Sequence, residues 1–398
     1  MTILLLVSGL AVFLAWNLGA NDVANAMGTS VGSKALTLRQ AILLAGVLEF
    51  SGAVLFGRQV IATLTRGVVD LDLFQSQPHL LLLGMVAVLL TCGVWLQVAT
   101  WQGWPVASSH ATVGAIAGMS CTAFGLRAVH WSMIGLISLI WVVTPLFSGL
   151  LAFFFYGIIN HNILARPQRL DEWLPWLSVL VCLVVGAVVL PQFSGFTRSI
   201  PGGTVVVALG GAISLTLYQW SRLDPGPELK VEQQMGRLQV ISASMVAFAH
   251  GSNDVGNAVA PLVAIATLSN TGSIPTGDLA APLWILILGG LGITAGLAVS
   301  GRAVMSTVGE QIIPLQTSSG FSAELATATT VLISSRFGLP VSTTHALIGG
   351  VVGTGLVEGW RKIQLSTLRQ IVLAWVVTIP ISMVMSALVF TGLRQLPF

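Results

Sequence analysis

The sequence predicts an all-α membrane protein that crosses the bilayer several times. Only 8% of its 398 residues are charged and 55% are hydrophobic, whereas about 25% of the residues of a soluble protein are charged. Apolar windows without a charged residue recur along the chain, for example at 80–97, 131–156 and 173–190. Each holds about 18 residues or more, which is the length that a membrane-spanning helix needs.

Apolar runs and the residues that break them predict about 12 helical segments. Gly and Asn interrupt the apolar pattern at 19–28 and 251–257, and Pro105 and Pro340 interrupt it elsewhere. We therefore expect broken helices and half-helices, because unwound backbone at membrane depth is tolerated where it is buried in protein or lines a cavity. The expected helices lie near 3–18, 39–57, 80–101, 110–124, 131–157, 174–192, 203–220, 237–251, 281–300, 322–336, 346–358 and 368–393.

Two polar motifs occur twice, in the same order. Residues 17–36 align with 249–268 at a constant offset of 232, and both copies carry Asn-Asp-Val followed by a further Asn. Residues 103–118 align with 338–353 at an offset of 235. This duplication predicts a first repeat at 1–130, connecting helices and a polar loop at 131–236, and a second repeat with a final helix at 237–398. Paired interruptions in two halves are typical of transporter binding sites.

The Pro-Val-x-(Ser/Thr)-(Ser/Thr)-His motif has the chemistry of an anion site. Proline suits the first turn of a helix, so we expect Pro105 and Pro340 to open two half-helices. The free N–H groups of a first turn and the positive end of the helix dipole attract anions, and neighbouring hydroxyls add donors. The alternative is that the hydroxyls are ordinary N-caps of buried helices. These residues are Ser108, Ser109, Thr343 and Thr344.

The Asn-Asp motif has the chemistry of a cation site. An intramembrane carboxylate is costly unless it is paired or coordinated, and neither Asp22 nor Asp254 has a Lys or Arg within the motif. Carboxylate and amide oxygens are hard ligands that suit a small cation such as Na⁺. The alternative is that each Asp caps the following helix segment. The amide residues are Asn21, Asn25, Asn253 and Asn257.

Four further ionisable residues lie in apolar surroundings. His110 and His345 follow the hydroxyl pairs and serve either coupling or structure. Glu49 and Glu324 are not repeat mates, so they are either ion ligands, proton sites or partners of arginines. The candidate arginines are Arg58, Arg302 and Arg336.

These motifs resemble those of the inorganic phosphate transporter (PiT) family. "GANDVAN" and "GSNDVGN" match one paired signature of the family, and "PVASSHATVG" and "PVSTTHALIG" resemble the other. The similarity covers almost the entire chain and is strongest to the bacterial and plastid-type branch. It implies two inverted-topology repeats, a substrate site at the midplane of the membrane, and symport of phosphate with Na⁺ or a proton, often by a homodimer.

The resemblance also implies roles for individual residues. The anion would lie among the four hydroxyls, and no cofactor is expected beyond the co-transported Na⁺ or proton. The residues that complete the anion site would be Asp22, Asn25, Asp254 and Asn257. The residues that hold sodium would be Asn21, Asp22, Asn253, Asp254 and Glu324.

The alternatives concern the substrate and the class of protein. Some bacterial members of the family carry sulfate, but a pocket carboxylate favours phosphate, which still has a proton to donate. An intramembrane hydrolase would use Ser109, His110 and Asp22, yet two near-symmetric motif copies fit that chemistry poorly. An anion channel would not need cation sites in both halves.

Charge and cysteine content bear on the partners and the cellular location of the protein. The net charge of +3 is spread over loops, so no nucleic-acid partner is indicated. The three cysteines suggest neither a disulfide frame nor a zinc site. We expect a multi-pass protein of the plasma membrane, specifically a bacterial inner membrane. Lys34 and Arg39 follow the first span, which predicts an external N-terminus.

Overall fold

The computed structural model describes residues 2–188, 203–221, 229–274, 281–301 and 315–396. In this part of the chain the secondary structure is helical apart from one isolated bridge between Val69 and Val129. The α-helices are α1 (Thr2–Gly32), α2 (Leu38–Phe56), α3 (Arg58–Ala62), α4 (Pro78–Gln102), α5 (Ser108–Phe124), α6 (Trp131–Ile159), α7 (Leu170–Val188), α9 (Gly203–Trp220), α10 (Leu229–Thr271), α11 (Leu283–Ser300), α13 (Thr317–Arg336), α14 (Thr343–Glu358) and α15 (Leu365–Leu393).

The predicted all-α membrane fold is confirmed. Each of the expected segments corresponds to a helix, although the end of segment 174–192 lies outside the described residues. Six described helices are long and apolar enough to cross a bilayer, judged by length and composition. They are α1, α2, α4, α6 with its short extension to Leu164, α11 and α15.

The predicted breaks at 19–28 and 251–257 are wrong, because α1 and α10 run through both motifs without interruption. The glycines serve close packing instead. A Cβ on Gly19 would overlap the backbone of Ile293, and one on Gly251 would overlap the backbone of Glu49. An unbroken helix also satisfies its own backbone hydrogen bonds, which the apolar surroundings of a bilayer favour.

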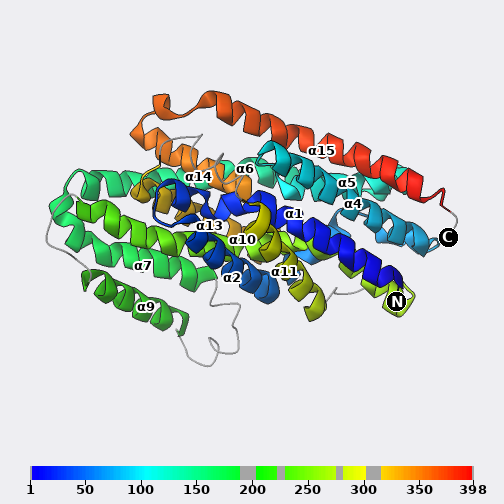
Figure 1. Cartoon of the computed structure of the whole chain (residues 1–398), viewed down its shortest axis with the longest axis horizontal. Coiled ribbons are helices and arrows are strands. Elements are labelled where there is room, and N and C mark those ends of the chain that lie inside the picture. The colour runs from blue at the N-terminus through cyan, green and yellow to red at the C-terminus, as the bar shows by residue number, and fades with distance from the viewer. Residues whose placement is uncertain (1, 189–202, 222–228, 275–280, 302–314, 397–398) are drawn as a thin grey trace.

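Helices from different parts of the chain pack against one another. Helix α1 packs along α11, and α10 packs along α2 and α13. The short helix α5 packs on α15, and α14 packs on α6. Figure 1 shows α15 along one edge of the molecule and α9, which packs on α7, at the opposite edge. The division into repeats stays a prediction. The pairs α1–α11, α2–α10, α5–α15 and α6–α14 join helices that it assigns to different segments, whereas α7 and α9 lie within one segment, as do α13 and most of α10.

The two half-helices begin later than the prolines. Helix α5 starts at Ser108 and α14 at Thr343, so Pro105 and Pro340 lie in the extended segments before them and do not open the helices. The carbonyl oxygens of both prolines accept hydrogen bonds from indole N–H groups of the outer helices. These bonds hold the prolines in the entry segments, and the hydroxyl residues occupy the first turns.

Candidate functional site

The duplicated motifs meet inside the protein. Helices α1 and α10 carry the Asn-Asp residues, and the first turns of α5 and α14 carry the hydroxyls. All of the predicted anion-binding side chains are buried, and the most exposed of them, Ser108, has a relative accessibility of 4%. A cluster of polar groups at this depth needs internal partners or ligands, because burial of an unpaired polar group is costly.

Hydrogen bonds connect the two motifs across the halves of the chain. The amide nitrogen of Asn25 donates to Asp22 Oδ1 at 3.0 Å and to Thr344 Oγ1 at 2.8 Å. In the second copy, Asn257 donates to Asp254 Oδ1 at 3.1 Å, and Thr343 Oγ1 donates to Asp254 Oδ2 at 3.2 Å. The carboxylates and the second hydroxyl pair therefore belong to one continuous site.

Several buried oxygens of this site lack a hydrogen-bond partner among the described residues, although Asp22 Oδ2 lies 3.9 Å from His250 Nε2. They belong to one hydroxyl, one carboxylate and the amides of the motif: Ser109 Oγ, Asp22 Oδ2, Asn25 Oδ1 and Asn257 Oδ1. Buried polar groups in native proteins are almost always hydrogen-bonded. Carboxylate and amide oxygens accept only, so they fit a cation, whereas a serine hydroxyl can donate to an anion.

Asn21 and Asn253 have matching surroundings. Asn21 Nδ2 donates to Thr100 Oγ1 at 3.2 Å and to the carbonyl of Trp104 at 3.0 Å. Asn253 Nδ2 donates to Ser335 Oγ at 2.9 Å and to the carbonyl of Leu339 at 3.2 Å. Each amide thus ties a long helix to the segment that enters a half-helix. The Oδ1 atom of each lacks a described partner and is available to a cation.

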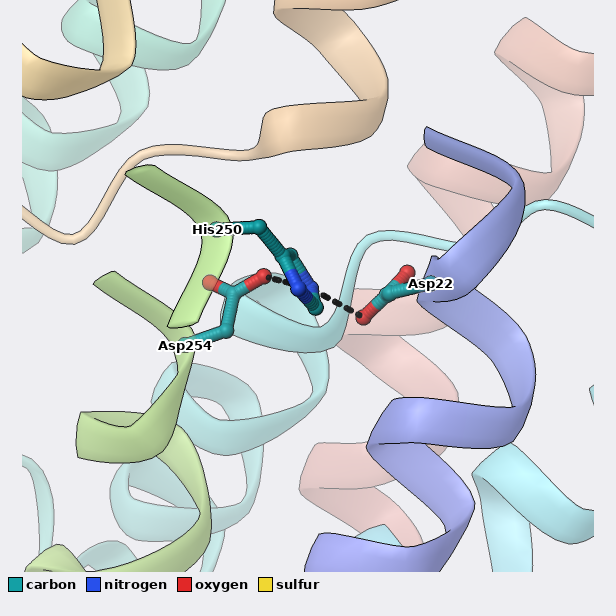
Figure 2. Close-up of side chains that lie close together, drawn as sticks. All are labelled: Asp22, His250 and Asp254. Atoms are coloured by element: carbon teal, nitrogen blue, oxygen red, sulfur yellow. Dashed lines mark ion pairs between the residues drawn. The ribbon is translucent and has the colours of Figure 1, made fainter. Parts of the chain in front are cut away.

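His250 lies among three buried carboxylates and is a residue that the sequence analysis missed. Its Nε2 is 2.8 Å from Asp254 Oδ2 and 3.9 Å from Asp22 Oδ2, and its Nδ1 is 3.1 Å from Glu49 Oε2. Figure 2 shows the imidazole between Asp22 and Asp254. Asp22, His250 and Asp254 can each offer one ligand atom, and these three atoms lie within 4.8 Å of one another, a spacing that suits a metal ion.

The position of His250 explains why the repeat search overlooked it. The offset between the two motif copies places Leu18 opposite His250, so the histidine has no repeat mate. The usable signal was its place four residues before Asp254, since residues at that spacing lie on one face of a helix. Glu49 pairs with this histidine and not with Arg58, which was one of its candidate arginine partners. Arg302, another of those candidates, lies outside the described residues.

Glu324 lies in a separate polar cluster. Its Oε1 accepts hydrogen bonds from Thr29 at 2.5 Å, Ser30 at 2.6 Å and Gln239 at 3.2 Å, and its Oε2 accepts one from Ser242 at 2.7 Å. Among the described residues these neutral groups are its recorded partners, so a pairing with Arg336 is not seen. A carboxylate with several hydroxyl and amide neighbours offers the oxygen ligands that suit a hard cation.

The geometry does not assemble a catalytic triad. His110 Nδ1 lies 3.1 Å from the carbonyl of Trp375, and Ser109 Oγ has no recorded partner among the described residues. A nucleophile and its base must lie in mutual hydrogen-bond reach. His345 has the matching arrangement, with Nδ1 3.0 Å from the carbonyl of Trp141.

An all-helical fold with several membrane-spanning helices and a buried site of carboxylates, amides and hydroxyls defines a multi-pass membrane transporter. The chain belongs to the phosphate transporter family, whose model matches residues 18–386. This membership confirms the resemblance to phosphate transporters, and the family comprises transporters, not enzymes.

Similar proteins cover nearly the whole chain. A protein of Pyrococcus abyssi named as a phosphate permease is 38% identical over 98% of this chain and 96% of its own length. The chloroplastic inorganic phosphate transporter 2-1 of Arabidopsis thaliana is 37% identical over 93% of this chain and 68% of its own length. A solved structure described as the sodium-dependent phosphate transporter is 34% identical, with a TM-score of 0.92 and full coverage of both chains.

Proposed function

We propose that the protein is a secondary active symporter that imports inorganic phosphate and that a sodium gradient drives it. The observation that carries this proposal is the excess of buried acid in the site. Asp22, Glu49 and Asp254 surround His250, which can carry at most one positive charge. A phosphate anion adds further negative charge, so co-bound cations are needed to stabilise it in a site of low dielectric constant.

The anion would lie between the first turns of α5 and α14. Ser108, Ser109, Thr343 and Thr344 would donate to its oxygens, and the positive ends of the two helix dipoles would face it. The residues that complete its site would be Asp22, Asn25, Asp254 and Asn257. The unpartnered, fully buried hydroxyl of Ser109 supports this placement.

The cations would be sodium ions held by oxygen ligands. The ligands nearest the anion would be Asn21, Asp22, Asn253 and Asp254. Glu324 would provide the carboxylate of the separate polar cluster that surrounds it. The name of the similar solved structure supports sodium, and a proton is the alternative. Phosphate is favoured over sulfate because the family and the named relatives are phosphate transporters.

The proposal includes the organisation of the protein in the cell. We place it in a bacterial inner membrane, with an external N-terminus, two inverted repeats and a homodimeric assembly. The matched surroundings of Asn21 and Asn253 support the repeats, because each amide binds the entry segment of the half-helix in its own half.

Uptake into proteoliposomes tests this function. Purified protein should accumulate ³²P-phosphate when an inward sodium gradient is imposed, and should accumulate little without it. Sulfate uptake and an inward proton gradient are the comparison conditions. Uptake that follows the proton gradient alone would show that the coupled ion is a proton and not sodium. Faster uptake of sulfate than of phosphate would show that sulfate is the substrate. Equilibration of phosphate without accumulation would indicate a channel.

A further inference from the structure

Two histidines and two tryptophans form a continuous stack between the half-helices. The His110 ring lies 3.8 Å from the Trp141 ring, and the His345 ring lies 3.7 Å from the Trp375 ring, measured between centroids. The two imidazoles meet edge to face, with centroids 4.7 Å apart and an interplanar angle of 82°. We name the four residues Trp141, His110, His345 and Trp375 the ring clasp.

Hydrogen bonds fasten each end of the ring clasp to an entry segment. Trp375 on α15 donates from Nε1 to the carbonyl of Pro105 at 3.3 Å, and its own carbonyl lies 3.1 Å from His110 Nδ1. Because a carbonyl oxygen only accepts, His110 Nδ1 carries a proton and donates it. The tip of α5 is thus bonded twice to one residue of α15.

The tip of α14 is fastened in the same way to α6. Trp141 Nε1 donates to the carbonyl of Pro340 at 3.0 Å, and His345 Nδ1 donates to the carbonyl of Trp141 at 3.0 Å. Each histidine therefore bonds to one outer helix and stacks on the tryptophan of the other. A shift of one half-helix tip must strain the contacts of the second.

We infer that His110 and His345 are positioning residues that hold the two hydroxyl pairs at a fixed separation, so that both halves of the anion site form together. They directly follow Ser109 and Thr344 in the first turns of α5 and α14, so their ring contacts fix the backbone that presents the hydroxyls. The inference rests on the proposed anion site and adds that its two halves are energetically coupled.

A double-mutant cycle measures this coupling. His110→Asn and His345→Asn each keep an N–H donor for the carbonyl but remove the ring. Each should raise the phosphate Kd about threefold to tenfold, the range expected for one aromatic contact or hydrogen bond. The double variant should be no weaker than the poorer single variant, because the first substitution already interrupts the stack.

The controls separate positioning from general damage. Trp95→Phe removes an indole N–H that donates to Thr378 on the same outer helix α15, at 3.3 Å and outside the ring clasp, and should leave the phosphate Kd unchanged. The Na⁺-induced rise in melting temperature without phosphate, which reports the proposed sodium sites as a whole, should match wild type in all variants. A merely structural lesion would reduce it.

The outcomes are distinct. Single effects that multiply in the double variant, an unchanged Kd in both single variants, or a sodium response that falls in parallel with phosphate affinity would overturn the inference. If the asparagine variants do not fold, Trp141→Phe and Trp375→Phe replace them, because these variants keep the aromatic stack but lose the hydrogen bonds to the prolines. Together they should raise the phosphate Kd by more than the product of their single effects. A Kd equal to that product would overturn the inference. Absence of phosphate binding by wild type would overturn the proposed function instead.

Discussion

The amide nitrogen of Asn25 donates a 2.8 Å hydrogen bond to the hydroxyl of Thr344, although 319 positions separate the two residues in the chain. The same amide also donates to Asp22, so one side chain joins a carboxylate of the first motif to a hydroxyl of the second half. The predicted cation and anion ligands are therefore in direct contact. A ligand that changes one of them must affect the other.

Loss of the hydroxyls should weaken anion binding. Ser109→Ala and Thr344→Val should each raise the phosphate Kd about tenfold to 100-fold, because each removes a hydrogen bond to a charged ligand. Thr330→Val is the matched control, since that buried hydroxyl donates to Ala326 within its own helix. Isothermal titration in Na⁺ measures all three, and wild-type affinity in both site variants would remove these hydroxyls from the anion site.

Neutralising Glu324 should impair the response to sodium. Glu324→Gln keeps the shape of the side chain but removes the charge from a cluster of hydroxyl and amide donors. We expect a flatter dependence of phosphate uptake on Na⁺ concentration. Glu358→Gln is the control, because Glu358 accepts from Tyr156 and Lys362 and takes no part in the proposed sites. Similar sodium curves for Glu324→Gln and wild type would exclude Glu324 as a ligand.

Removing His250 should make the fold dependent on sodium. His250→Ala leaves three carboxylates without their shared partner, and loss of one member of a buried ion pair costs about 3–5 kcal/mol. The melting temperature should therefore fall in Na⁺-free buffer and recover as Na⁺ is added, by more than that of wild type. Glu49→Gln combined with His250→Asn should restore part of the loss. A sodium-independent decrease would mean that His250 contributes packing alone.

Close helix packing at Gly19 should make this position intolerant of a side chain. Gly19→Ala should reduce stability by about 1–3 kcal/mol, since the added Cβ would overlap the backbone of α11. Gly9→Ala on the same helix has no described atom within 4 Å of the new Cβ and should be neutral or slightly stabilising. Thermal unfolding in detergent compares them. Equal melting temperatures would contradict the packing.

Sequence patterns predicted the positions of the helices well, but they failed for residues whose role depends on contacts with another helix. Apolar runs located the spans because the bilayer imposes their length and composition. The glycines at 19 and 251 were read as helix breaks, but their role depends on a second helix that local sequence does not reveal.

The candidate site could likewise be predicted only in part. Duplication identified the Asn-Asp and hydroxyl motifs, because both halves carry them. His250 has no counterpart in the first half, and its contact with Glu49 joins α10 to α2. The neutral partners of Glu324 come from α1 and α10, so spacing along α13 could not reveal them.

The most direct test of the central claim is the phosphate Kd measured as a function of Na⁺ concentration for wild type and Asp22→Asn. If sodium at Asp22 and Asp254 compensates the charge of the anion, the wild-type Kd should fall as Na⁺ rises, and phosphate should tighten Na⁺ binding by the same factor. Asp22→Asn should weaken phosphate binding and reduce that dependence. A wild-type Kd that does not change with Na⁺, or an Asp22→Asn protein with an unchanged sodium dependence, would contradict the account.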